Sequence, residues 1–283
     1  MALSAALCKS CHSTLLRGSS FQRPFRQATA KHLSRPVVPR LDRRFHSKQA
    51  TATAPPAGLA IPPWTDSEEQ KQALRQLQDA MNKCVYGQPD EDTLKWFLRD
   101  RKLDAEEAAH KLTNMLKWRQ DFQADSITWD MVAKEAGTGK AYLHEHKDVN
   151  GQPVIVIRSS LHKTGEFSLD DSKRLCILIL EKALKQLPEG QDTVLGVFDL
   201  RGFKQKNGDL GFAGFLRDIF FTYYPKRLGQ VLFMDAPWIF QPSWNLFKPL
   251  LGKYAGLVAF VSREQLRDNY FTPETVPDDF KHD

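Results

Sequence analysis

The chain has 283 residues, of which 41% are hydrophobic, 26% charged and 11% aromatic. This length fits one large domain or two small ones. The 18 Phe, 6 Trp and 6 Tyr can build a hydrophobic core, which excludes a largely disordered chain. No run of about 18 apolar residues occurs, so we expect no transmembrane helix. Four Cys are too few for a disulfide scaffold.

The net charge of +6 is distributed unevenly along the chain. Residues 1–60 contain 10 Lys and Arg and a single acidic residue, Asp42, whereas residues 61–283 contain 30 Lys and Arg and 33 acidic residues. The basic character therefore belongs to the N-terminal segment, and we expect no nucleic-acid partner.

Residues 1–60 are predicted to be a transit peptide that ends in a proline-rich linker. The segment is rich in Ala, Ser, Thr and Arg and lacks the long apolar core of a secretory signal. Pro55 and Pro56, followed by Pro62 and Pro63, indicate a stiff linker. The Ala- and Ser-rich start favours a plastid over a mitochondrion. The alternative is a disordered basic tail on a cytosolic protein.

Residues 64–125 are expected to form a small helical subdomain. Apolar residues recur at three- and four-residue spacing within residues 66–84, and residues 93–99 predict a second, short helix. Asp104 followed by Glu107 resembles a capping box and predicts the start of a third helix.

From Gly151 onwards the pattern changes to short apolar runs, which are typical of strands buried on both faces. These runs cover residues 153–158, 193–200, 230–235 and 256–261. Helices are predicted between and after them at residues 168–187, 209–223 and 241–252. The alternation of strands and helices predicts an α/β layer fold for residues 126–283.

No motif for catalysis or metal binding is complete. Residues 137–140 lack the spacing of a phosphate-binding loop, and no Gly-x-Ser-x-Gly occurs. The His-Glu-His run 144–146 lacks the spacing that places two His on one helix face, and it is predicted to be a solvated loop. Asp199 and Asp235 each follow an apolar run and are expected to be turn or cap residues. We expect no enzymatic activity, no metal and no cofactor other than a bound ligand.

The stretch 236–251 carries an unusual apolar load for one helix. Its large apolar residues include Trp238, Ile239, Phe240, Trp244, Phe247, Leu250 and Leu251. Pro242 fits the first helical turn, and Pro249 is expected to kink or end the helix. A helix that is apolar on most of its surface faces a core, a membrane or an apolar ligand. The two interpretations are a buried core helix and a movable lid that contacts a membrane when it opens.

Several motifs resemble those of CRAL-TRIO lipid-transfer proteins. They are residues 93–104 with 117–119 in the helical part, and residues 199–202, 223–229, 235–237, 246–251 and 276–280 in the α/β part. The resemblance covers residues 66–280, and the closest subgroup resembles the plastid phosphatidylinositol-transfer-like proteins. It implies a CRAL-TRIO fold, in which a mixed, mostly parallel sheet with flanking helices and a lipid pocket follows a small helical subdomain.

The resemblance also implies a head-group site, a lid and a pocket. The residues that would bind the head group are Arg101, Lys102, Lys226 and Arg227, and the lid would be residues 238–251. The residues that would line the pocket are Val194, Gly196, Phe198, Ala255 and Val258. Ala255 and Val258 stand where phosphatidylinositol-binding members carry a head-group Thr and Lys. Residues 194–196 replace the Ser-x-Thr that binds choline lipids.

We therefore predict a monomeric protein that binds one membrane lipid in an apolar pocket. The lipid would be phosphatidylinositol or another anionic phospholipid, such as phosphatidic acid. The protein would associate peripherally with plastid membranes, transfer or present the lipid there, and support membrane and vesicle biogenesis. The alternatives are a protein that binds an isoprenoid of the carotenoid or tocopherol type, and a ligand-gated regulatory sensor.

Overall fold

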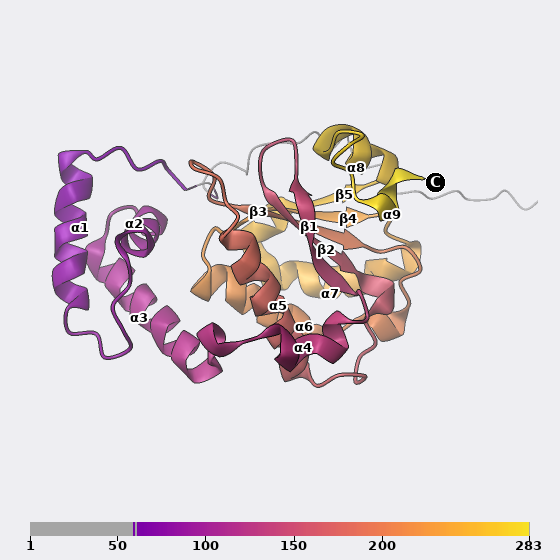
Figure 1. The fold of residues 1–283 in the computed structure, drawn as a ribbon, viewed down its shortest axis with the longest axis horizontal. Helices are drawn as coiled ribbons and strands as arrows, with labels where there is room; N and C mark the ends of the chain where they lie inside the picture. The colour runs from indigo at the N-terminus through magenta and orange to yellow at the C-terminus, as the bar shows by residue number, and fades with distance from the viewer. Residues whose placement is uncertain (1–58, 60, 283) are drawn as a thin grey trace, which may run out of the picture. The chain divides into compact units, whose positions relative to one another are not determined.

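The computed structural model of the chain describes Leu59 and residues 61–282. The predicted transit peptide and the first part of the predicted linker lie outside these residues. Within them, three helices are followed by a sheet that is flanked by further helices (Figure 1).

The first part contains the three predicted helices. They are α1 (Glu68–Met81), α2 (Glu91–Asp100) and α3 (Ala105–Phe122). Each helix begins after a residue whose side chain accepts a hydrogen bond from a free backbone N–H of the first turn, namely Ser67, Asp90 and Asp104. The predicted start at Asp104 is confirmed, because its carboxylate accepts from the Glu107 N–H at 3.0 Å.

The second part is a five-stranded sheet with the strand order β1-β2-β3-β4-β5. The strands are β1 (Ala141–Lys147), β2 (Pro153–Arg158), β3 (Val194–Asp199), β4 (Leu228–Met234) and β5 (Val258–Val261). β1 is antiparallel to β2, and the other neighbours are parallel. The predicted mixed, mostly parallel sheet is confirmed.

The helices of the second part alternate with the strands, as the sequence predicts. They are α4 (Trp129–Ala136), α5 (Leu169–Leu184), α6 (Leu210–Asp218), α7 (Gln241–Leu251), α8 (Arg263–Tyr270) and α9 (Asp278–Lys281). A π-helical turn (Ile219–Tyr223) continues α6. The apolar periodicity did not reveal α4, α8 or α9, which are short helices.

The prediction of a solvated loop at residues 144–146 is wrong, because these residues belong to strand β1. His144 is buried, and its Nε2 lies 2.7 Å from the carbonyl oxygen of Thr275. β1 lies at the edge of the sheet, so its sequence lacks the continuous apolar run that marks β2 to β5.

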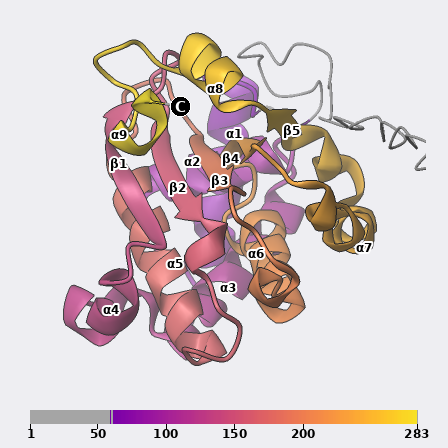
Figure 2. The ribbon, with the colours of Figure 1, turned by 90° about the vertical axis from the view of Figure 1, so that its right-hand side faces the viewer.

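The two faces of the sheet pack against different helices (Figure 2). Alternate residues of each strand point to opposite faces. Leu195 and Val197 of β3 belong to a core with α8, α9 and the C-terminal segment. Val194 and Phe198 belong to the opposite face, which the N-terminal helices, α5 and α7 cover.

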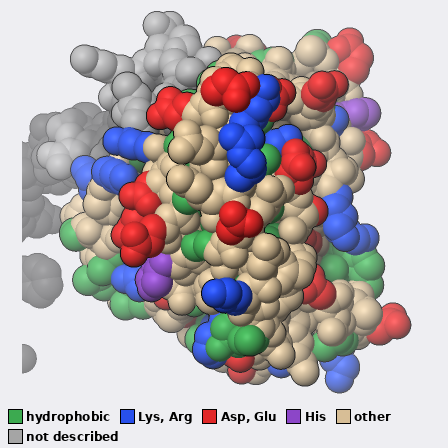
Figure 3. Space-filling view, turned by 90° about the vertical axis from the view of Figure 1, so that its left-hand side faces the viewer, with side chains coloured by type: hydrophobic (Ala, Val, Ile, Leu, Met, Phe, Trp, Pro, Cys, Tyr) green, Lys and Arg blue, Asp and Glu red, His purple; other side chains and the backbone are tan. Residues whose placement is uncertain are grey.

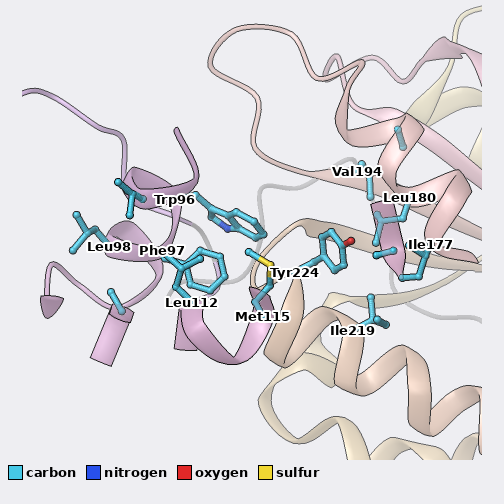
Figure 4. Close-up of a cluster of buried hydrophobic side chains, with 14 of the residues drawn as sticks. Trp96, Phe97, Leu98, Leu112, Met115, Ile177, Leu180, Val194, Ile219 and Tyr224 are labelled. Atoms are coloured by element: carbon cyan, nitrogen blue, oxygen red, sulfur yellow. The ribbon is translucent and has the colours of Figure 1, made fainter. Parts of the chain in front are cut away.

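The N-terminal helices share one hydrophobic core with the α/β part (Figure 4). In this core the Trp96 ring lies 4.7 Å from Phe97 and 6.4 Å from Tyr224 between centroids, and Met115 lies next to Tyr224, which follows the π-helical turn. The indole N–H of Trp96 also donates to the carbonyl oxygen of Pro225 at 2.9 Å. Burial of these aromatic rings therefore stabilises the helical part against the α/β part.

A hydrogen-bonded triad ties α3 to α5 through Tyr224. Arg119 Nη1 donates to Glu181 Oε1 at 2.6 Å and to the Tyr224 hydroxyl oxygen at 2.9 Å, and this hydroxyl donates to Glu181. We expect Tyr224→Phe to lower the free energy of unfolding by about 1 kcal/mol, because it removes one hydrogen-bonding partner from a buried network.

Urea denaturation measures this effect, and Tyr223→Phe is the matched control. The Tyr223 ring stacks on Trp118 at 4.4 Å between centroids, and that stacking survives the loss of a hydroxyl. Equal free energies of unfolding for Tyr224→Phe and the wild type would show that the hydroxyl of Tyr224 does not stabilise the packing of the helical part against the α/β part.

A second polar network is buried between α4, α5 and the start of α6. His162 Nδ1 lies 3.1 Å from Lys140 Nζ, and His162 Nε2 lies 3.4 Å from Asp209 Oδ2. Glu135 forms an ion pair with Lys140 and accepts a hydrogen bond from the hydroxyl of Ser172. Burial, and next the charge of Lys140, lower the pKa of His162 below its ordinary value.

This lowered pKa predicts a loss of stability in mild acid. The unfolded chain binds a proton at His162 near pH 6.5, where the folded protein does not yet bind it, so stability falls as the pH drops through this value. We expect the free energy of unfolding to decrease less between pH 7 and pH 5 in His162→Gln than in the wild type. Parallel pH curves for the two proteins would contradict this role of His162.

Candidate functional site

α7 and the 3₁₀ turn before it (Trp238–Phe240) cover one face of the sheet at β4 and β5. Phe240, Trp244, Phe247 and Leu251 point inwards. They meet Phe198, Leu200, Phe203, Val231, Phe233, Val258 and Phe260, and we call this set the aromatic layer. Trp244 is only 7% exposed, and its ring centroid lies 5.4 Å from that of Phe233. The layer is therefore apolar, and the rings around Phe233 pack edge to face.

The opposite side of this segment is exposed and also apolar. Trp238 is 76% exposed, Leu246 58% and Leu250 46%, and Ile239 is exposed as well. We call these four residues the outer lid face. The structure thus divides the predicted lid residues into an inward and an outward set, and it adds Leu246 to the outward set. Exposed apolar patches of this kind mark surfaces that contact a partner or a membrane.

The predicted pocket residues lie on the sheet face below α7 or close to it. Gly196 and Phe198 lie on the same face of β3 as Val194, which belongs to the core shared with the N-terminal helices. Val258 begins β5 and belongs to the aromatic layer. Ala255 lies in the 3₁₀ turn that follows α7.

A cluster of cations surrounds Asp100 at the end of α2. Asp100 Oδ2 accepts hydrogen bonds from Lys111 Nζ at 2.7 Å and from Arg101 Nε at 3.0 Å. Lys226 Nζ lies 3.9 Å from Asp100 Oδ1. The charge of Lys102 also acts on Lys226. We call Asp100 and these four cations the basic cluster.

The basic cluster holds more positive charge than its own carboxylate balances. The side chains of Asp100, Lys111 and Lys226 are largely buried, with 3%, 11% and 11% of their surface exposed. Arg101 is 33% exposed and Lys102 is exposed, so the imbalance of charge extends from a buried carboxylate to the surface. Burial lowers the pKa of Lys111 and of Lys226, and neighbouring cations lower each further. An added anion would relieve this repulsion. Figure 3, viewed from the side of the N-terminal helices, shows acidic and basic side chains interspersed on the surface.

The basic cluster lies beside the turn that follows α7. Charges on Asp100 and Arg101 act on Tyr254, and the charge of Lys253 acts on Lys226. The Tyr254 ring stacks on Phe221 at 3.9 Å between centroids. Gly252, at the end of α7, has φ of +52°, a conformation that favours glycine. The end of the helix that covers the aromatic layer is therefore next to the cations.

Arg227 points elsewhere, although it follows Lys226 in the sequence. Its Nη1 lies 3.1 Å from the carbonyl oxygen of Asp192, and its guanidinium lies 4.1 Å from the Trp96 ring centroid. Arg99 binds the carboxylate of the same Asp192. The structure therefore gathers Arg101, Lys102 and Lys226, and it gives Arg227 internal partners.

The two aspartates at strand ends have local partners. Asp199 accepts the backbone N–H of Arg201 at 3.0 Å and pairs with its guanidinium. Asp235 accepts a hydrogen bond from the backbone N–H of Arg263 at 3.2 Å.

Over Leu59 and residues 61–282, no group of three His, Cys, Asp or Glu side chains could hold a metal ion. In the same part of the chain, no helix is long and apolar enough to cross a membrane.

These parts define an α/β domain in which one apolar helix covers an aromatic layer and ends beside a cluster of cations. The chain belongs to the CRAL/TRIO domain family, which its residues 136–281 match. The predicted membership of the CRAL-TRIO family is confirmed.

Three relatives are similar to the chain over most of its length. It is 30% identical to phosphatidylinositol transfer protein CSR1 of Eremothecium gossypii over 231 residues, which cover 74% of this chain and 52% of that protein. It is 27% identical to SEC14 cytosolic factor of Kluyveromyces lactis over 215 residues, which cover 70% of this chain and 71% of that protein. It is 23% identical to Patellin-6 of Arabidopsis thaliana over 197 residues, which cover 64% of this chain and 48% of that protein.

The chain spans about half the length of the first of these relatives. None of the three is named as a plastid phosphatidylinositol-transfer protein, so the predicted closeness to that subgroup stays a prediction. Among solved structures, the crystal structure of Sfh5 matches with a TM-score of 0.56 and 19% identity over 70% of this chain and 82% of that one. This likeness supports the fold.

Proposed function

We propose that the chain binds one anionic phospholipid beneath α7 and transfers it between membranes. The observation that carries the proposal is the adjacency of two unlike surfaces, the apolar aromatic layer that α7 covers and the basic cluster beside the end of α7. A phospholipid has the same two-part chemistry. Two of the relatives described above are named phosphatidylinositol transfer protein and SEC14 cytosolic factor, which agrees with this choice.

Capture of the lipid requires α7 to move away from the sheet. The aromatic side chains fill the space beneath α7 in this structure, so acyl chains enter only if the inward set is displaced. Burial of acyl chains provides about 25 cal/mol per Å² of apolar area as the driving force. Gly252 is the natural hinge, because its positive φ places a flexible residue where the helix ends.

The basic cluster would bind the phosphate. Arg101 offers a planar guanidinium with several donors, and Lys111 and Lys226 offer point charges. Arg227 keeps its partners, Asp192 and Trp96, and would hold the neighbouring loop in place. No group of the basic cluster needs to form or break a covalent bond, so the proposed activity is binding and transfer rather than catalysis.

The outer lid face would contact the membrane during exchange. Trp and other large apolar side chains insert favourably into the interfacial region of a bilayer, where Trp is enriched. Exposed Lys248 lies on the same helix and would add attraction to anionic lipids. The protein would associate with the membrane peripherally, as a monomer.

Delivery to a plastid is also a proposal. It rests on residues 1–60, whose composition is that of a transit peptide and which hold 10 Lys and Arg against one acidic residue. A fluorescent fusion of the full chain, compared with one that lacks these residues, tests the destination. Mitochondrial import or a cytosolic signal from the full-length fusion would contradict it.

Transfer between two populations of vesicles tests the proposed function. Donor vesicles contain labelled phosphatidylinositol, phosphatidic acid, phosphatidylcholine or α-tocopherol, and acceptor vesicles contain none of the label. We expect transfer of an anionic phospholipid at least about tenfold faster than that of phosphatidylcholine. Preferential transfer of tocopherol would favour an isoprenoid-binding protein. Tight binding without transfer would favour a ligand-gated sensor.

A further inference from the structure

Strand β1 is an edge strand with an open outer side. It pairs only with β2 in the five-stranded sheet, and in Figure 2 its outer side lies between α9 and α4. An open edge presents unpaired backbone donors and acceptors that another chain can bind. None of these groups belongs to the aromatic layer or to the basic cluster.

The pairing register shows which backbone groups point outwards. The N–H of Arg158 donates to the carbonyl oxygen of Lys140 at 2.7 Å, which marks a hydrogen-bonded pair. In an antiparallel ladder, hydrogen-bonded pairs of residues alternate with non-hydrogen-bonded pairs, whose backbone groups point away from the partner strand. Ala141 and Leu143, opposite Ile157 and Ile155, therefore direct their N–H and C=O groups away from β2.

Two hollows border this edge, and they share the residues from Tyr142 to Glu145. One, of about 380 Å³, lies between β1 and the helices α4 and α5, and Trp129 and Lys182 line it. The other, of about 440 Å³, lies between β1 and the C-terminal segment 274–281. The two hollows lie on either side of β1, and we call β1 together with these two hollows the edge groove.

The two walls of the edge groove differ in chemistry. The α4 wall carries the Trp129 ring, which is 43% exposed, and the Lys182 ammonium lies 4.4 Å from the centroid of this ring. The C-terminal wall is acidic. Its hollow is lined by four carboxylates, those of Glu145, Glu274, Asp278 and Asp279, and by the positive charges of Arg158 and Lys281. Asp278 is paired with Lys281 and Asp279 with Arg158, so the excess negative charge of this wall lies on Glu145 and Glu274.

We propose that an extended segment of a partner protein docks in the edge groove as a sixth strand, with apolar and basic residues in alternation. Successive side chains of an added strand point to opposite faces of the sheet. Apolar side chains would therefore meet Trp129 and Leu143, while basic side chains would meet Glu145 and Glu274. Backbone hydrogen bonds to Ala141 and Leu143 would supply affinity, and the two walls would supply specificity.

A second copy of this chain fits the edge groove less well. Antiparallel pairing of two β1 strands requires a twofold axis perpendicular to the sheet, which places the two acidic walls on the same face of the joined sheet. Carboxylates of one copy would then approach those of the other, and like charges in such positions are destabilising. The excess of carboxylates thus favours a basic segment of another protein.

Selection of random linear peptides on the immobilised full chain tests the proposal. We expect the enriched peptides to alternate apolar and basic residues. Glu145→Lys/Glu274→Lys is expected to weaken their binding at least about tenfold, since it replaces attraction by repulsion at two places. The matched control is Glu69→Lys on α1, whose exposed side chain lies outside the groove. Lipid transfer is expected to be unchanged in both variants, which shows that they fold.

N-methylation of the selected peptide separates strand addition from charge attraction alone. Methyl groups on the alternate amides that face β1 should abolish binding, whereas methyl groups on the other amides should be tolerated. Equal loss from both peptides, enrichment of acidic peptides, or unchanged binding to Glu145→Lys/Glu274→Lys would overturn the proposal. So would a concentration-dependent dimer of the full chain that Glu145→Lys/Glu274→Lys abolishes.

Discussion

Replacement of Trp238 by aspartate is expected to slow lipid transfer between vesicles at least about tenfold without unfolding the protein. Burial of one large apolar side chain in a membrane provides about 1.5–3 kcal/mol, and a factor of ten requires about 1.4 kcal/mol. Trp238 is 76% exposed, so the folded protein loses little packing when it is replaced. The same change at Trp244 would place a charge inside the aromatic layer, and it therefore cannot test membrane contact.

Two control variants make this result interpretable. Trp129→Asp changes another exposed tryptophan, on α4, and is expected to leave transfer unchanged. Leu250→Asp changes a second residue of the outer lid face and is expected to reproduce the loss. Transfer is measured at equal protein concentration, with circular dichroism as the check on folding. If Trp238→Asp transfers lipid at the wild-type rate, the outer lid face does not contact the membrane.

Replacement of Lys226 by glutamine is expected to weaken binding of anionic phospholipid by about ten- to a hundredfold. A hydrogen bond to a charged group contributes about 1.5–3 kcal/mol, and the loss of one full charge from the basic cluster acts in the same direction. Asp100 keeps its bonds to Lys111 and Arg101 in this variant, so no buried carboxylate is left without a partner. Lys226→Gln therefore removes one contact to the ligand and leaves the partners of Asp100 in place, so Lys226 is a better position for this test than Lys111.

Binding of a neutral lipid provides the internal reference for this variant. Lys226→Gln should bind α-tocopherol or diacylglycerol as the wild type does, because the aromatic layer is unchanged. Lys71→Gln, on the exposed side of α1, is the matched surface control. Equal weakening of neutral and anionic lipids would mean that Lys226 supports the fold rather than the head group.

Much of the fold is predictable from local patterns. β2 to β5 are nearly continuous apolar runs because both faces of the sheet are covered, and such runs are visible in the sequence. β1 is not predicted as a strand from its sequence, because it lies at the edge of the sheet. Its residues Glu145, His146 and Lys147 are charged or polar and exposed. Coverage of a strand by other elements is a property of the folded molecule, and local sequence shows it only indirectly.

The candidate site was only partly predictable, because its charges are arranged by tertiary packing. Asp100 stands between Arg99 and Arg101 in the sequence, yet the side chains of these two arginines contact different carboxylates. Lys111 reaches Asp100 only because α3 packs against α2. Lys226 and Arg227 are neighbours in the chain but have separate partners. Spacing along the chain cannot reveal these pairings.

The lid residues, too, could be predicted from the sequence only in part. The apolar load of residues 238–251 is plain in the sequence, but its division into two faces depends on which side meets the sheet. Trp244 and Trp238 illustrate this division, since the first is buried and the second is exposed. A single apolar stripe would be typical of a core helix, whereas apolar residues on both sides indicate a helix with two partners.

Mass spectrometry of the lipid that copurifies with the protein tests whether the basic cluster selects an anionic phospholipid. The protein, made without residues 1–60, is incubated with plastid membranes, purified again and extracted, and Lys226→Gln is treated in parallel. We expect about one anionic phospholipid per wild-type protein and a strongly reduced amount in Lys226→Gln. A neutral prenyl lipid bound equally by both proteins would contradict it, because the basic cluster would then play no part in choosing the ligand.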